Sequence, residues 1–180
     1  LSPADTNFAV KNVINGKKYF WYIEAVLEDG RTVKSSVQIA LFKIAEKPHV
    51  ITIEGVENAR DIGGLTANDG KKIKNGILFR TAELNSTTET KITEVGKRYV
   101  LDTLKVKTDL DLRKPNQISG NGTVPTFGPL GNSVKYINLS ATEYYNFTLG
   151  NTNEAEIMRV FANPQNYPIL FHCVYGADRT

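Results

Sequence analysis

The clearest pattern along the chain is a set of short segments rich in apolar and β-branched residues, separated by polar stretches. Segments of this kind predict buried strands when they are too short for a helix and are bounded by turn-forming residues. The strongest examples are Val50–Ile53, Val106–Leu112, Val134–Leu139 and Pro168–Cys173. Because helical patterns lie between them, we expect an α/β fold with a mostly parallel sheet, and a ligand site at the carboxyl ends of its strands.

One helical pattern lies near the middle of the chain. Ser86 and Glu89 have the spacing of a capping box, in which each side chain binds the backbone of the other. Apolar residues that include Ile92 and Val95 then recur at helical spacing. We therefore predict a helix that begins at this box and reaches about Leu104.

A second helix is predicted after Asn153 and Glu156, which have the same capping spacing, with Ile157 and Val160 on its apolar side.

Residues 114–133, by contrast, are rich in Gly, Pro, Asn and Ser. A loop of this length often borders a functional site. Two interpretations stay open for it, a lid over the site and a disordered surface excursion.

The N-terminal part of the chain has a different pattern. Lys18–Leu27 is aromatic and β-branched, Glu28–Gly30 is a turn sequence, and Thr32–Ala40 has strand character, so the three predict a β-hairpin. Its aromatic residues, among them Tyr19 and Trp21, favour the core of a sandwich over a ligand platform. Because an isolated hairpin is marginally stable, these strands must pair with a preceding segment, dock on the rest of the chain, or exchange with a second copy.

Composition excludes several classes of function. The chain has 180 residues, 41% hydrophobic and 23% charged, and a net charge of +3 without a long basic run, which argues against nucleic-acid binding. It contains neither an apolar stretch long enough for a transmembrane segment nor a signal peptide at its start. The single cysteine excludes an internal disulfide, and the two histidines, His49 and His172, do not form a metal-ligand cluster. We expect no cofactor.

The strongest chemical signal lies in the last nine residues, His172–Thr180. The only cysteine, Cys173, follows an apolar strand, and Arg179 follows it six positions later. Hydrolysis of a phosphate monoester requires a strong nucleophile and neutralisation of a dianion, which a thiolate and an arginine supply. A lone cysteine is more often a small buried hydrophobic residue. The combination of strand, histidine, internal glycine and flanking hydroxyl favours the catalytic interpretation.

The residues between the cysteine and the arginine suit an anion-binding loop. Gly176 permits a tight curl in which the backbone N–H groups of residues 174–179 point inward, and such groups lower a thiol pKa from about 8.5 to roughly 3.5–7.5. Arg179 is expected to bind two phosphoryl oxygens. His172 is expected to orient the loop, and Thr180 to donate its hydroxyl to the sulfur.

The loop resembles the signature of the cysteine-dependent protein tyrosine phosphatases, and upstream segments resemble the bacterial atypical tyrosine/serine phosphatases of dual or triple specificity. The likeness covers roughly residues 50–180. The segments that carry it, in the order that family shows, are Glu57–Leu65, Asp69–Ile73, Gly76–Leu84, Asp109–Arg113 and Phe161–Pro164. The N-terminal strands resemble the last strands of a fibronectin type III sandwich, with Tyr19 as its corner tyrosine.

The resemblance implies the cysteine-phosphatase fold and hydrolysis of phosphotyrosine, with phosphoserine and phosphothreonine as further substrates, through a phosphocysteine intermediate. The phosphate-binding residues would be Val174, Tyr175, Gly176, Ala177, Asp178 and Arg179. The substrate would be a phosphorylated protein or peptide.

The general acid is less well defined by the resemblance. Asp178 is the first candidate, although bracing of the loop is an alternative role for it. Asp111 is the second candidate, and an ion pair with Arg113 or Arg80 is the interpretation we favour for it.

Two structural pairs are also expected to support the loop. They are Arg60 with Asp61 and Arg80 with Glu83.

One position departs from the family pattern, because Ala177 stands where lysine is common. That lysine is associated with highly anionic substrates. An inositol-phosphate or phosphoinositide phosphatase is therefore a less favoured alternative, and a non-catalytic phosphate-binding module is another.

These patterns divide the chain into a partial fibronectin type III-like segment with its linker, residues 1–46, and a phosphatase domain, residues 47–180. Lys43–Pro48 is the predicted linker. Both ends are expected to be cuts, the second just after the phosphate-binding loop, so that little activity is expected of these residues alone. The appended segment favours a bacterial envelope or secreted setting, by association.

Overall fold

The computed structural model describes residues 2, 4–13, 18–41, 48–141 and 152–180. The chain divides into two compact units, Leu1–Ala45 and Glu46–Thr180. Most of the predicted linker, Lys43–Pro48, lies outside the described residues.

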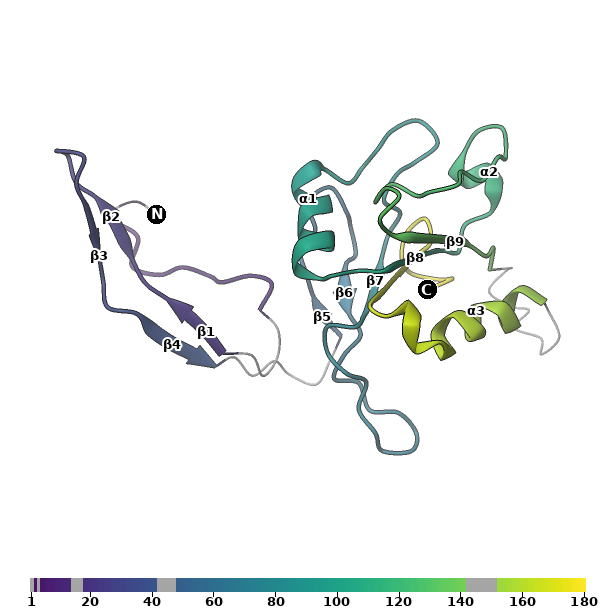
Figure 1. Ribbon diagram of the computed structural model, residues 1–180, viewed down its shortest axis with the longest axis horizontal. Helices are drawn as coiled ribbons and strands as arrows, with labels where there is room; N and C mark the ends of the chain where they lie inside the picture. Colours follow the sequence, from purple (N-terminus) through teal and green to yellow (C-terminus); the bar gives the residue numbers. More distant parts are fainter. Residues whose placement is uncertain (1, 3, 14–17, 42–47, 142–151) are drawn as a thin grey trace. The chain divides into compact units, whose positions relative to one another are not determined.

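The first unit contains two antiparallel strand pairs (Figure 1). Strand β1 (Lys18–Trp21) pairs with β4 (Gln38–Leu41), and β2 (Glu24–Val26) pairs with β3 (Thr32–Lys34). At the turn between β2 and β3, Gly30 adopts a φ of +80°, which glycine tolerates without strain. Phe20 and Ile39 face each other in the register of β1 and β4, and both are largely exposed. The fibronectin type III assignment of this unit stays a prediction.

The second unit is built on a six-stranded sheet with the order β5-β6-β7-β10-β8-β9. The bounds of the strands are β5 (His49–Val50), β6 (Arg60–Asp61), β7 (Leu78–Thr81), β8 (Thr108–Asp111), β9 (Lys135–Asn138) and β10 (Ile169–His172). Strands β7, β10, β8 and β9 are parallel, whereas β5 and β6 pair antiparallel. The predicted mostly parallel sheet is confirmed.

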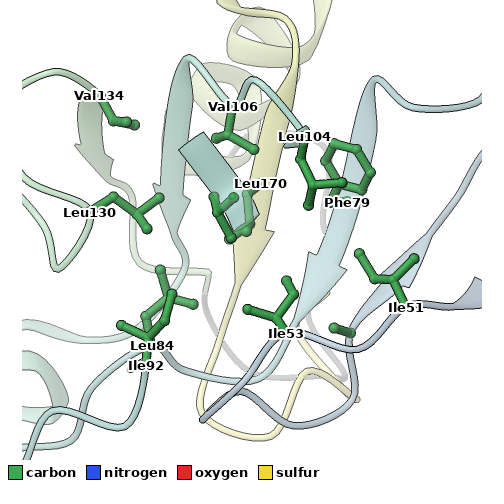
Figure 2. Packing of buried hydrophobic residues seen from close by; sticks show 12 residues of the cluster. Ile51, Ile53, Phe79, Leu84, Ile92, Leu104, Val106, Leu130, Val134 and Leu170 are labelled. Carbon is green, nitrogen blue, oxygen red and sulfur yellow. The ribbon is translucent and has the colours of Figure 1, made fainter. Parts of the chain in front are cut away.

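Apolar side chains cover both faces of this sheet, as expected for strands buried on two sides. On one face, Leu170 of β10 packs with Phe79 of β7 and with the residues shown in Figure 2. On the other face, Ile169 and Phe171 of β10 pack with a helix between residues 152 and 162. Adjacent side chains of β10 point to opposite faces of the sheet, so β10 packs into both clusters. This packing fixes the position of His172, the last residue of β10.

The helices correct two details of the sequence prediction. The segment after Ser86 does not begin a helix: the Ser86 Oγ accepts from the N–H of Glu89, but the chain then folds back, since the N–H groups of Lys91 and Ile92 both bind the carbonyl of Leu84. The helix starts eight positions later as α1 (Glu94–Arg98), capped by Thr93, and continues as a π-helix over Tyr99–Thr103.

The second correction concerns α3 (Thr152–Ala162). Asn153 lies inside this helix and does not cap it; its Nδ2 donates to the carbonyl of Ser140 at 3.1 Å. The described part of the unit also contains two short helical turns, α2 (Pro115–Ile118) and a 3-10 turn over Pro164–Asn166. Among the described residues, no helix is long and apolar enough to cross a membrane.

The sheet brings the chemistry-bearing segments together at one edge. In the parallel register, His172 of β10 lies between Thr81 of β7 and Asp111 of β8. The segments that leave these three strands therefore meet at the carboxyl edge, where parallel sheets place their ligand sites.

Candidate active site

The loop after β10 curls back near the C-terminus (Figure 1, yellow segment). Gly176 adopts a φ of +63°, and a Cβ at this position would lie 2.4 Å from the carbonyl oxygen of Thr81. Both the backbone conformation and the close approach to β7 therefore require glycine. The preceding residue, Tyr175, is 73% exposed, whereas Cys173 at the base of the loop is buried.

The curl directs backbone N–H groups at the cysteine sulfur. Burial alone would raise the pKa of the Cys173 thiol, but the N–H groups of Arg179, Ala177 and Gly176 and the charge of the Arg179 guanidinium outweigh it, so the pKa is lowered. Hydrogen bonds to a charged form favour that form, and a thiolate is the nucleophilic form of cysteine. The loop therefore favours the thiolate form of Cys173 over what burial alone would allow.

The carbonyl groups of the same peptides are held from outside the loop. Arg80 of β7 donates from Nε to the carbonyl of Gly176 at 2.9 Å, and from Nη2 to that of Ala177 at 2.8 Å. Asn58 donates from Nδ2 to the carbonyls of Tyr175 and Gly176 at 2.9 and 2.8 Å. In a trans peptide the carbonyl and the next N–H point in opposite directions. Anchoring these carbonyls outward therefore turns the following N–H groups inward.

The other contacts at the ends of the loop are with backbone and hydroxyl groups. The Thr180 hydroxyl accepts from Arg80 Nε at 3.0 Å, so its closest described partner is Arg80, and its predicted donation to the sulfur stays a prediction. The carbonyl of Val174 accepts from the N–H of Glu83 at 3.1 Å. Arg80 thus supports the loop directly.

The predicted pairing of Arg80 with Glu83, however, is wrong. Glu83 instead binds Lys91 at 2.9 Å and Arg113 at 3.1 Å. The reason lies in the strand, because Arg80 is within β7 and reaches the loop, whereas Glu83 lies beyond the end of β7 and faces the buried Arg113.

The predicted pairing of Arg60 with Asp61 is also wrong. Arg60 donates from Nη1 to Asn58 Oδ1 and so orients the amide that binds the loop. Asp61 is buried and accepts from the N–H groups of Gly63 and Gly76 at 2.8 and 2.7 Å. Neighbouring strand residues point to opposite faces, which separates the two side chains.

Below the loop lies a buried ion network. The carboxylate of Asp111 accepts from Arg113 Nη2 at 2.7 Å and from the Tyr136 hydroxyl at 2.9 Å, so the expected Asp111–Arg113 ion pair is present. Burial opposes ionisation of Asp111, but the charges of His172 and Arg113 and the hydrogen bonds from Arg113 outweigh it and lower its pKa. A carboxylate held ionised in this way has no proton to give, which argues against Asp111 as the general acid.

Arg179 is oriented by a residue that the sequence did not single out. Its Nη1 donates to Gln117 Oε1 at 2.8 Å, and lies 3.4 Å from the carbonyl oxygen of Leu112. The same Gln117 oxygen accepts from the N–H of Lys114 at 3.0 Å, which fixes the amide within α2. Part of the segment 114–133 thus borders the site, as its length suggested.

The remaining predicted site residues lie at the rim. Ala177 and Asp178 are exposed, and both belong to the bend between Gly176 and Arg179. Within the described part of the chain, no group of three or more His, Cys, Asp or Glu residues is placed to hold a metal ion. The site therefore consists of one thiol, one guanidinium, a ring of backbone N–H groups and one exposed carboxyl.

Comparison with known proteins gives a family but little structural detail. The model of the tyrosine phosphatase family matches residues 51–180. No curated protein matches the chain. Among solved structures, the core catalytic domain of the PP-IP phosphatase SIW14 from S. cerevisiae, in complex with citrate, matches with 17% identity and a TM-score of 0.35. The match covers 55% of this chain and 52% of that one, so the chain spans about half of the solved structure.

We predict that replacing Arg80 with alanine weakens the binding of inorganic phosphate or vanadate by about 10- to 100-fold, because hydrogen bonds to charged groups are each worth about 1.5–3 kcal/mol. The loop carbonyls would lose their anchor and the N–H groups their direction. Calorimetric titration measures the affinity. Arg98→Ala, which removes the same charge from an exposed position of α1, is the matched control. Equal affinities for the two variants would contradict the role of Arg80.

Proposed function

The chain belongs to the tyrosine phosphatase family, and from this premise we propose that it hydrolyses phosphotyrosine, and also phosphoserine and phosphothreonine, through a phosphocysteine intermediate. The observation that supports this best is the convergence of backbone N–H groups on the buried Cys173 sulfur, with the resulting fall in its pKa. An inert structural cysteine would not need such an environment, since burial in apolar surroundings raises its pKa.

In the first step, the Cys173 thiolate attacks phosphorus, the S–P bond forms, and the P–O bond to the leaving alcohol breaks. Arg179 binds two non-bridging oxygens through its planar fork, and the loop N–H groups bind the same dianion. In the second step, water attacks phosphorus, the S–P bond breaks, and inorganic phosphate leaves. No step requires a metal ion or an organic cofactor.

Asp178 is proposed to donate the proton to the leaving oxygen and to remove a proton from the attacking water in the second step. Its support is positional: it lies within the loop, next to Arg179, and it is exposed. Asp111 is buried and ion-paired, and therefore does not compete for this role.

The rim of the loop supports a phosphorylated protein or peptide as the substrate. Ala177 is exposed and adds no positive charge beside Arg179. An inositol polyphosphate carries several phosphates, and each would require its own cation near the loop. Relative rates on a phosphotyrosine peptide and on inositol hexakisphosphate distinguish the two substrate classes.

For the first unit, we propose the fibronectin type III-like role that its sequence suggests. The antiparallel strand pairs and the exposed apolar side chains of Phe20 and Ile39 support a sheet that is covered by further strands. Strand exchange with a second copy is one way to supply them, and the oligomeric state in solution tests it.

Replacing Cys173 with serine in the full-length protein is expected to reduce turnover of 4-nitrophenyl phosphate to background, because a serine hydroxyl is not ionised at neutral pH. Phosphate binding should be retained within about threefold, since the N–H groups and Arg179 are unchanged. The wild type should form a phosphorylated cysteine, seen as phosphate attached to Cys173 in rapidly quenched samples. Turnover by the serine variant at the wild-type rate would rule out this mechanism.

Replacing Asp178 with asparagine is expected to slow substrates according to their leaving group. Phenyl phosphate, whose leaving oxygen needs a proton, should slow by about 10²–10⁴-fold. The activated ester 4-nitrophenyl phosphate should slow far less, because its leaving group departs as an anion. Asp69→Asn, which removes the same charge from an exposed turn, serves as the control. An equal loss on both esters would favour a bracing role for Asp178.

A further inference from the structure

Asp109 is a buried carboxylate that the proposed mechanism does not use. It lies in the centre of β8 with only 1% of its surface exposed. Among the described residues, neither of its carboxylate oxygens receives a well-aligned hydrogen bond. An isolated buried charge is costly, so a carboxylate in this position requires a nearby positive charge.

The sheet register supplies that partner. Asp109 faces Leu170 of β10, and Asp111 faces His172, so the two carboxylates and the imidazole lie on the same face. The His172 Nε2 is 3.1 Å from Asp109 Oδ1, and the angle, not the distance, keeps this contact from being an aligned hydrogen bond. On the other side of Asp109, a Cβ at Gly128 would lie 2.7 Å from Oδ2. The backbone at Gly128 therefore approaches Asp109 so closely that no side chain fits at position 128.

Both ring nitrogens of His172 face acceptors. Nε2 faces Asp109, while Nδ1 lies 3.4 Å from the carbonyl oxygen of Cys173 and 3.8 Å from Asp111 Oδ1. A neutral imidazole has one donor and one acceptor nitrogen, so it would turn a lone pair toward an oxygen on one side. The doubly protonated ring satisfies both sides.

Two other titratable groups near the His172 ring, Arg113 and Tyr136, form their hydrogen bonds with Asp111. This carboxylate already accepts from Arg113 and from the Tyr136 hydroxyl of β9. Burial would lower the pKa of His172 and Arg113 opposes its protonation, but the charges of Asp111 and Asp109 outweigh them and raise its pKa. Asp109 differs from Asp111 in having no cation near it except His172 among the described contacts.

We propose that Asp109 is a positioning residue that holds His172 as an imidazolium, and that this charge, directly below the loop, helps to keep Cys173 ionised. The Nδ1–H of the charged ring faces the carbonyl of Cys173, the first carbonyl of the loop. Because the peptide is planar, holding this carbonyl below the loop turns the N–H of Val174 the opposite way. The ring thus holds the first carbonyl of the loop, as Asn58 and Arg80 hold the later carbonyls.

The inference rests on the proposed role of Cys173, but its test does not use turnover. In the wild-type protein, nitrogen-15 NMR of the histidine rings should show both nitrogens of His172 protonated at pH 7.5. His49 is the only other histidine, and a His49→Gln variant assigns the signals. A neutral His172 ring at pH 7.5 would overturn the proposal, whatever the activity.

The matched variant is Asp109→Asn, which keeps the shape of the side chain and removes its charge. We expect the His172 ring to lose its second proton near its ordinary value of about 6.5. Once the ring is neutral it no longer stabilises the thiolate, so the midpoint for alkylation of Cys173 by iodoacetamide should shift upward by about one pH unit. The single cysteine of the chain makes the rate unambiguous.

Asp102→Asn is the control, because Asp102 is exposed in the π-helix and its loss changes the net charge equally. This variant should leave both the protonation state of the His172 ring and the midpoint of Cys173 alkylation unchanged. An Asp109→Asn variant that folds normally, with the Cys173 midpoint unchanged or lowered, would contradict the proposal. Failure of the proposed phosphatase mechanism would be seen separately, as turnover by the protein with Cys173 replaced by serine.

Discussion

The planarity of the peptide group is the constraint on which the site depends. Each peptide between Tyr175 and Asp178 has a carbonyl and an N–H that point in opposite directions, so fixing one fixes the other. Asn58 and Arg80 bind the carbonyls on the outer side of the loop, and the N–H groups therefore converge on Cys173. The thiolate is thus stabilised by N–H groups that already point at the sulfur before a substrate binds. Such preorganised groups stabilise an anion without the free-energy cost of reorienting them.

The sheet holds these anchors at fixed distances. Arg80 belongs to β7, the cysteine follows β10, and Asp111 ends β8, and these three strands are neighbours with apolar residues on both faces. The polar residues at their carboxyl ends are buried beneath the loop, where they form a connected network from Lys91 through Glu83, Arg113 and Asp111 to His172. Such a network is rigid when each member is satisfied. Among the ion pairs of the described residues, Asp109 takes part in one, the contact with His172.

The sequence allowed the main features to be predicted because they are local. A short apolar strand, the spacing of Cys173 and Arg179, and the glycine between them are all contained in one segment, and the strand pattern predicted the parallel sheet. The anchors were harder to predict, since Asn58 and Gln117 lie 118 and 62 positions from their partners in the loop. An asparagine or glutamine has no periodicity that reveals its target, and its role emerges only from the three-dimensional arrangement.

The errors have the same origin. Ser86 has the local signature of a helix cap, but the backbone of Lys91 and Ile92 binds Leu84 in preference to continuing a helix. The pairings of Arg80 with Glu83 and of Arg60 with Asp61 rested on proximity in sequence. Alternation along β6 sends Arg60 and Asp61 to different faces, whereas Glu83 lies beyond the end of β7 and binds Lys91 and Arg113. In both cases a tertiary contact outweighed a plausible local one.

The most direct measurement is the titration of Cys173 in the wild-type protein, followed by the rate of alkylation as a function of pH. Because the chain has one cysteine, the midpoint reports this thiol alone. If inward-facing N–H groups stabilise the thiolate, the rate reaches its plateau with a midpoint below the ordinary value of about 8.5. A midpoint at or above that value would mean that burial prevails over the loop, and would contradict the account.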